Sequence, residues 1–277
     1  MKYLIIGFNS LTAKLVYRSN EITYLLTQCL QMVISILMWI SIYHGTDRHT
    51  LNNMALSQMI QYLVITNLTA ILFSASPIFR MANQVKSGQL TTILLRPISI
   101  YGEQITYYVG SQFPYLCINF GLLLIYSNQS LQSKLILITY LTLAFIMFFT
   151  TMLVIGTLSF WLINMWPLRS AVNACYLILG GLSFPLTFLG KGIYKWLQFN
   201  PFSLVADVPA RMVTHLINDS TPYFIAVSSW LIITLLIYRI LIKVGIKKNM
   251  KGLASNFEIF TLSMATQSTG ILSISNY

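Results

Sequence analysis

Long apolar stretches, separated by short polar or charged breaks, run along almost the whole chain. A helix needs about 20 apolar residues to cross the hydrocarbon core of a membrane, so each charge-free stretch is a candidate span. The fourth stretch is too long for one span and too short for two, and it predicts a single helix that extends past the bilayer. The pattern predicts six spans, at residues 22–43, 54–79, 104–126, 135–164, 170–188 and 222–241.

The first 20 residues have a different pattern from the spans. Leu4, Phe8 and Leu15 recur at helical spacing, while Lys14 and Arg18 fall off that stripe. An apolar stripe opposite a basic face is typical of a helix lying in the membrane interface. The alternative is an extension of the first span.

Between the early predicted spans the sequence has only one sizeable polar break, from Arg80 to Glu103. Gly88 is placed to end a short helix, and Pro97 disfavours helical geometry at Arg96 and should end another. We therefore predict a short amphipathic helix in this break.

The stretch from Leu189 to Thr221 is rich in aromatic residues and prolines, and its apolar pieces are too short to span a membrane. Pieces of that length beside a membrane are typical of re-entrant or interfacial helices. Residues 257–277 are polar and rich in Ser and Thr, and we expect this tail to be poorly ordered or to rest on a partner.

The composition supports lipid as the main solvent of the chain. Only 8% of the 277 residues are charged, whereas a soluble domain needs roughly a quarter. The fold class predicted is an all-α integral membrane protein, with one membrane domain over residues 1–256. The net charge of +11 does not indicate a nucleic-acid partner, because the basic residues are thinly spread between apolar runs.

The distribution of basic residues predicts the orientation. With the N-terminus in the cytoplasm, 12 of the 17 Lys and Arg residues face the cytoplasm. The other five face outward, and they are Arg48, Lys134, Lys191, Lys195 and Arg211. Basic residues are enriched in cytoplasmic loops, so both termini are predicted to be cytoplasmic.

The sequence contains few groups that carry chemistry. All six acidic residues fall in loops or at span ends, which disfavours a proton- or sodium-coupled transporter. His44, His49 and His215 do not lie at ligand spacing with each other or with a cysteine, and no phosphate-binding G-x-x-x-x-G-K-[ST] loop is present. We predict no catalytic site, no metal site and no cofactor within this chain.

Several short motifs follow one another in a characteristic order. Gly88-Gln89-Leu90 precedes Leu94-Leu95-Arg96-Pro97; further along come Phe160-Trp161, Trp166 and Arg169, then Gly181 to Leu186 and Asn200-Pro201-Phe202. Together with the predicted layout, they resemble permeases of type-two ABC (ABC-2) exporters, in particular a bacterial branch with a G-x-L…LLRP segment. The resemblance covers about residues 1 to 255, although the Tyr-Glu run usual after the last span is replaced by Lys247 to Gly252.

The resemblance implies a coupling helix from Asn83 to Arg96 that docks on a separate ATPase subunit, which binds MgATP and is expected in two copies. The coupling residues it implies are Lys86, Gly88, Leu90, Leu94, Leu95, Arg96 and Pro97. It also implies an outer gate in the re-entrant segment, formed by Phe184, Pro185, Trp196, Asn200, Pro201 and Phe202.

By the same resemblance, a second and different permease chain completes the transporter in the cytoplasmic membrane. The expected function is export of an amphipathic or apolar substrate, such as a peptide or a lipid. Three alternatives remain: a non-transporting protein that confers immunity by sequestering a toxin or peptide, a secondary transporter, and an intramembrane enzyme.

Overall fold

A computed structural model describes the backbone of residues 2–45, 50–51, 54–126, 131–162, 164–214, 216–217 and 219–274. Side chains are described over the same ranges up to residue 248, apart from residues 122–126. All structural statements below concern these residues.

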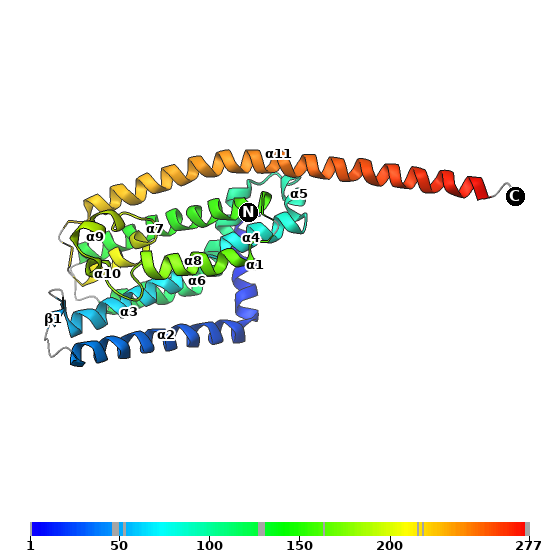
Figure 1. Cartoon of the computed structure of the whole chain (residues 1–277). Coiled ribbons are helices and arrows are strands. Elements are labelled where there is room, and N and C mark those ends of the chain that lie inside the picture. The colour runs from blue at the N-terminus through cyan, green and yellow to red at the C-terminus, as the bar shows by residue number, and fades with distance from the viewer. Residues whose placement is uncertain are drawn as a thin grey trace.

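The described chain is almost entirely helical (Figure 1). The longer helices are α1 (Lys2–Val16), α2 (Arg18–Gly45), α3 (Leu56–Leu72), α4 (Ser76–Lys86), α6 (Ile100–Tyr126), α7 (Leu131–Thr157), α8 (Trp166–Leu179) and α11 (Thr221–Ile274). The short ones are α5 (Gln89–Leu94), η1 (Leu158–Phe160), η2 (Leu186–Leu189), α9 (Lys191–Leu197), η3 (Ser203–Val205) and α10 (Asp207–Val213). Two strands, β1 (Thr50–Leu51) and β2 (Met54–Ala55), pair in antiparallel fashion.

Four helical stretches among the described residues are long and apolar enough to cross a membrane. They are Arg18–Gly45, Leu56–Lys86, Leu131–Phe160 and Thr221–Lys248. These stretches and the near absence of sheet confirm the predicted class, an all-α membrane protein. Helix α6 has 27 residues, and the side chains of its residues 122–126 lie outside the described part.

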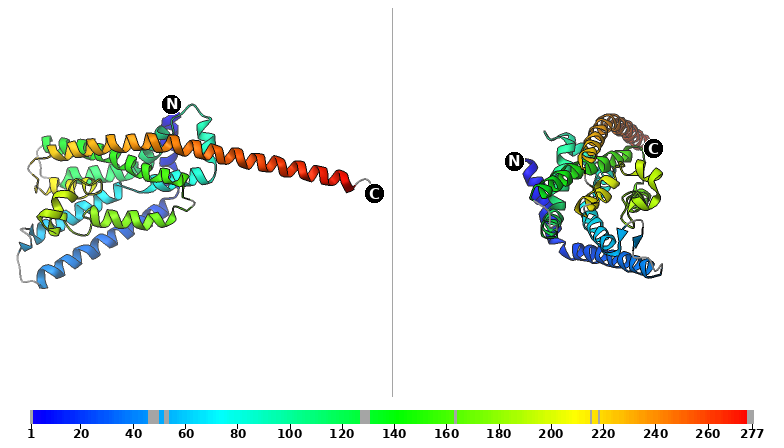
Figure 2. Two further views of the ribbon diagram at one scale, coloured as in Figure 1. Left: turned by 45° about the horizontal axis from the view of Figure 1, so that its top comes forward. Right: turned by 90° about the vertical axis from the view of Figure 1, so that its left-hand side faces the viewer.

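The long helices lie side by side in a bundle (Figures 1 and 2). Helices α2, α6 and α8 run in one direction, and α3, α4, α7 and α11 run in the other. We call the two ends of the bundle the α5 end, which also carries α1, and the α10 end, which carries the β1–β2 pair and α9. Helix α11 leaves the bundle at the α5 end and continues to Ile274.

The interior is built around α7, which packs against α11 and α4. Phe145 of α7 stacks on Tyr108 of α6 with ring centroids 4.9 Å apart, and Phe148 meets Phe73 edge-on at 5.4 Å. Aromatic pairs in these geometries add roughly 0.5–1.5 kcal/mol beyond the area they bury. This cluster holds α6, α7 and the end of α3 together.

The second predicted span is interrupted. Helix α3 ends at Leu72 and α4 begins at Ser76, with Pro77 in its first turn. The Tyr108 hydroxyl accepts a hydrogen bond from the Ser74 amide at 3.1 Å and donates one to the Ser74 carbonyl at 3.2 Å. The side chain of α6 thus replaces helical hydrogen bonds that the break removes.

Two other predicted boundaries differ from the structure. The fourth predicted span was expected to reach residue 164, but α7 and η1 end at Phe160. The fifth, predicted at residues 170–188, is the 14-residue helix α8, which ends at Leu179. At 1.5 Å per residue α8 is about 21 Å long, shorter than the roughly 30 Å hydrocarbon core. Gly181, with φ +74°, turns the chain away from the helical path.

Helix α1 is separate from the first span, from which it is divided at Tyr17, and it crosses α2 at a steep angle (Figure 1). It packs on α6 through its Gly7 and Ser10 face. Its Lys14 ammonium lies 2.9 Å from Glu21 of α2. The predicted apolar stripe points away from this contact, since Leu4 and Phe8 are 77% and 69% exposed. The stripe is therefore free to face lipid.

Replacing Gly110 with valine should displace α1 from α6. A Cβ at position 110 would clash with the main-chain oxygen of Gly7 and the Ser10 hydroxyl, and overpacking of this kind costs about 1–3 kcal/mol. Limited proteolysis of the purified chain should then cut within α1 faster than in the wild type. Gly121→Val in the same helix is the matched control, because nothing lies within 4 Å of its added Cβ. Equal cleavage rates for both variants would contradict this packing.

Candidate functional site

The polar break after the second span forms a helix–turn–helix at the α5 end. Helix α4 ends at Lys86, and Gly88 adopts φ +73°, the left-handed region that glycine enters without a Cβ penalty. The Ser87 amide donates to the Asn83 carbonyl at 2.9 Å, and α5 follows directly. The predicted stop at Gly88 is confirmed, but the segment expected as one helix from Asn83 to Arg96 is two.

The two faces of α5 have different environments. Leu90 and Ile93 are buried against the bundle, at 0% and 8% exposure. Leu94 and Leu95 are 40% and 83% exposed, and Arg96 and Pro97 beyond them are exposed too. Leu90, predicted as part of a docking surface, instead anchors α5 to its own chain. The apolar surface available to a partner is formed by Leu94 and Leu95.

A buried polar cluster joins the two sides of this turn. Arg80 of α4 is paired with Glu103 of α6, and its guanidinium lies 3.3 Å from the centroid of the Tyr107 ring. Gln84 and Gln104, both buried, hydrogen-bond to each other within the same cluster. Glu103 is 8% exposed and Arg80 25%, so removing Arg80 would leave a mostly buried carboxylate unpaired, and the pair connects α4 to α6. The sequence identified Glu103 only as a span-end acid.

Residues 180–214, which we call the re-entrant segment, form the second site, at the α10 end. They include η2, α9, η3 and α10, which are short helices joined by turns. Aromatic side chains from four different helices donate to its main-chain carbonyls: Trp39 to Ser183 (2.8 Å), Tyr62 to Gly181 (2.8 Å), Tyr140 to Leu204 (2.7 Å) and Trp230 to Phe199 (2.7 Å). These side chains provide partners for main-chain groups that are not paired within a regular helix or sheet.

Asn200 organises the middle of the re-entrant segment. Its side-chain oxygen accepts hydrogen bonds from the Phe202 and Ser203 amides at 2.7 and 2.9 Å, which forms an Asx-turn leading into η3. Its amide nitrogen donates to the Leu179 carbonyl at the end of α8, at 3.0 Å. Pro201 follows, with no amide hydrogen to compete for that oxygen. The Asn-Pro-Phe motif therefore ties the segment to α8.

The remaining predicted gate residues are spread over this segment rather than gathered in one cluster. Pro185 is buried, Phe184 is half-buried, and Phe202 packs edge-on against Phe148 at 6.4 Å. Trp196 on α9 is 83% exposed.

Asp207 is fully buried at the start of α10, a placement that the sequence did not reveal. Its carboxylate accepts hydrogen bonds from the Tyr62 hydroxyl at 2.7 Å and from the Leu186 amide at 3.4 Å. The Arg211 guanidinium is 3.8 Å away. Burial raises the pKa of Asp207 to about 6, against the hydrogen bond from Tyr62, which lowers it. The sequence signal was weak, since Asp207 and Arg211 are merely spaced i,i+4 in a Pro-containing stretch.

Comparison with known protein families gives a match to the family described as ABC-2 family transporter protein. The match covers residues 29–250 and so includes both sites, from α2 to the end of the membrane-crossing part of α11. No curated protein matches the chain.

Proposed function

Because the chain belongs to the ABC-2 family of transporter proteins, we propose that it is the membrane-spanning permease subunit of an ATP-binding-cassette exporter. Two copies of a separate ATPase subunit supply the energy, since this chain carries no phosphate-binding loop. MgATP binds to those subunits.

The observation that carries the proposal is the exposed leucine pair on α5. Two adjacent leucines at 40% and 83% exposure, flanked by Arg96, form a small apolar contact with a basic edge. Burying a leucine side chain contributes roughly 1.5–3 kcal/mol. The pair docks on the ATPase, and the Arg80–Glu103 cluster transmits the resulting movement to α4 and α6.

In this proposal the chain crosses the membrane six times, with both termini in the cytoplasm. Helix α6 adds the fifth crossing to the four long stretches, and α8, too short alone, makes the sixth together with the re-entrant segment that follows it. The α5 end then faces the ATPase, and the re-entrant segment closes the exit. The exposed apolar face of α2, which includes Leu26, Leu30 and Leu37, is available to lipid and to a second permease chain, which the resemblance implies is a different one. The cargo is an amphipathic or apolar molecule, such as a peptide or a lipid.

A pull-down of the tagged chain from its native membrane in mild detergent tests this proposal. We expect a stoichiometric partner with a G-x-x-x-x-G-K-[ST] loop, with a second permease chain beside it. A chain that returns without any ATPase would contradict the proposal and favour a protein that sequesters a toxin or peptide.

A further inference from the structure

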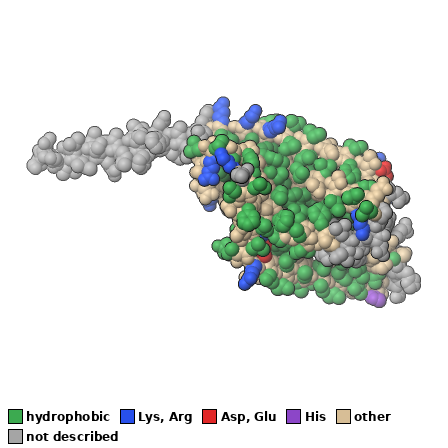
Figure 3. Space-filling view, turned by 180° about the vertical axis from the view of Figure 1, so that it is seen from behind, with side chains coloured by type: hydrophobic (Ala, Val, Ile, Leu, Met, Phe, Trp, Pro, Cys, Tyr) green, Lys and Arg blue, Asp and Glu red, His purple; other side chains and the backbone are tan. Residues whose placement is uncertain are grey.

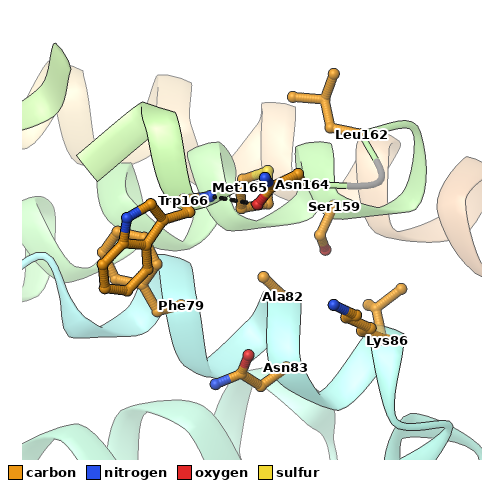
Figure 4. A pocket seen from close by; sticks show the side chains of 10 residues that line it. Phe79, Ala82, Asn83, Lys86, Ser159, Leu162, Asn164, Met165 and Trp166 are labelled. Carbon is orange, nitrogen blue, oxygen red and sulfur yellow. Dashed lines mark hydrogen bonds between the residues drawn. The ribbon is translucent and has the colours of Figure 1, made fainter. Parts of the chain in front are cut away.

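A pocket of about 340 Å³ lies between α4 and the connection from η1 to α8, at the α5 end (Figure 4). Its apolar wall includes Phe79 of α4 and Met165, and Trp166 stands at its side. Its polar groups come from Lys86 and Asn83 on α4 and Ser159 on η1. The pocket is thus apolar with a few polar groups, as ligand sites usually are.

The charge around the pocket is positive. Neither aspartate nor glutamate is among the described residues that line it, and Lys86 has no ion pair with any described residue. Arg169, one turn into α8, lies 5.7 Å from the ring centroid of Phe79 and 5.5 Å from that of Trp166. A lysine and an arginine beside one cavity without a counter-charge favour an anionic ligand.

A polar atom in the pocket lacks a partner. The Ser159 hydroxyl is buried and makes no hydrogen bond with any described residue. Figure 4 shows it pointing towards the space that the Lys86 ammonium also faces. A buried hydroxyl without a partner costs about 1–3 kcal/mol, which a ligand that accepts its hydrogen would recover.

The rim of the pocket has the character of a membrane interface. Trp166 is 67% exposed and Leu162 is 46% exposed. Trp161 nearby is 38% exposed, with the Lys248 ammonium 5.9 Å from its ring. Tryptophan and lysine are enriched where spans meet the lipid headgroups. Figure 3 shows, on the face seen from behind, basic side chains near the place where α11 leaves the bundle, next to a broad apolar surface.

We propose that this pocket binds the headgroup of an anionic phospholipid. The Lys86 ammonium pairs with the phosphate, the Ser159 hydroxyl donates a hydrogen bond to it, and Arg169 supplies a second positive charge. The acyl chains leave past Trp166 and Leu162 into the bilayer. Basic pockets between spans bind such headgroups. This proposal needs only the membrane location of the chain and does not depend on an ATPase.

Native mass spectrometry of the purified full chain tests the proposal. Dioctanoyl phosphatidylglycerol and dioctanoyl phosphatidylcholine, which share acyl chains and differ in headgroup charge, are added at equal concentrations. We expect the wild type to retain the phosphatidylglycerol preferentially. Lys86→Gln should weaken that binding about fivefold, and Ser159→Ala should weaken it as well. Ser159→Ala removes a hydroxyl without a partner, so it should not impair folding.

Lys191→Gln is the matched control, since it removes an exposed lysine of α9, at the α10 end. It should bind phosphatidylglycerol as the wild type does. Equal retention of the two lipids, or unchanged binding by Lys86→Gln, would overturn the proposal. Displacement of the lipid by excess inorganic phosphate would assign the pocket to a soluble phosphate compound instead and would also overturn it.

Discussion

Replacing Leu94 and Leu95 together with aspartate should abolish association with the ATPase subunit. Both side chains are exposed at the end of α5, so the change removes the apolar contact without creating a cavity in the core. Leu94 is 40% and Leu95 83% exposed, so docking would lose roughly 2–4 kcal/mol of apolar burial and would also have to desolvate two carboxylates. Co-purification of the ATPase from detergent-solubilised membranes measures the effect.

The control for this experiment carries the same two charges elsewhere. Leu131 and Ile193 are 78% and 57% exposed, and both lie away from α5, in α7 and α9. Leu131→Asp with Ile193→Asp should leave ATPase association intact, and both doubly changed chains should insert into the membrane. An ATPase that remains bound to the Leu94→Asp, Leu95→Asp chain would exclude α5 as the docking element.

Acidification from pH 7 to pH 4 should stabilise the fold through Asp207. Burial raises the pKa of this carboxyl from 3.8 to about 6, so the folded chain holds the proton more tightly than the unfolded chain does. The contribution of Asp207 is fully present below about pH 4 and is lost as the pH rises through about 6. A shift of this size corresponds to about 3 kcal/mol.

Thermal unfolding in detergent at a series of pH values measures this contribution. Asp207→Asn keeps the acceptor for Tyr62 but does not titrate, so the difference in stability between wild type and variant should change by about 2.5 kcal/mol between pH 4 and pH 7. Asp219→Asn, at an exposed aspartate outside the spans, should keep the dependence of the wild type. A pH-independent difference between Asp207→Asn and wild type would refute the raised pKa.

Tyr62→Phe should move this transition to higher pH. The hydroxyl of Tyr62 stabilises the ionised carboxylate, so its removal raises the pKa of Asp207 further. The same variant leaves the Gly181 carbonyl without its donor. A midpoint equal to that of the wild type would show that the Tyr62 hydrogen bond does not act on Asp207.

The sequence predicted the helical membrane fold because a hydropathy profile reports the length and charge of each stretch. Helices α2, α7 and α11 each contain a long stretch without Asp, Glu, Lys or Arg, at residues 22–45, 135–157 and 221–238. It could not predict the end of α8, because the stretch from Ser170 to Phe188 stays apolar while the backbone turns at Gly181. A hydropathy profile does not reveal a positive backbone φ, and the glycine is its only sign in the sequence.

The candidate sites were predictable only in part. The turn at Gly88 follows from local chemistry, so the sequence located it. The direction of each α5 side chain depends on packing against the bundle, which is why Leu90 was assigned to the wrong face. The burial of Asp207 depends on Tyr62 and Leu186, 145 and 21 positions away along the chain, and no local pattern reports such contacts.

The break between α3 and α4 divides the second predicted span into two arms, which are held by different parts of the chain. Tyr62 ties the α3 arm to the re-entrant segment, while the α4 arm carries the turn at Gly88. Helix α4 has 11 residues and is about 16 Å long, and it packs against α7 and α6. The Tyr108 hydroxyl, hydrogen-bonded to the main-chain amide and carbonyl of Ser74, holds the break against α6. A push on α5 would therefore move α4 together with α6, to which the Arg80–Glu103 pair connects it, while Tyr62 holds α3 to the re-entrant segment.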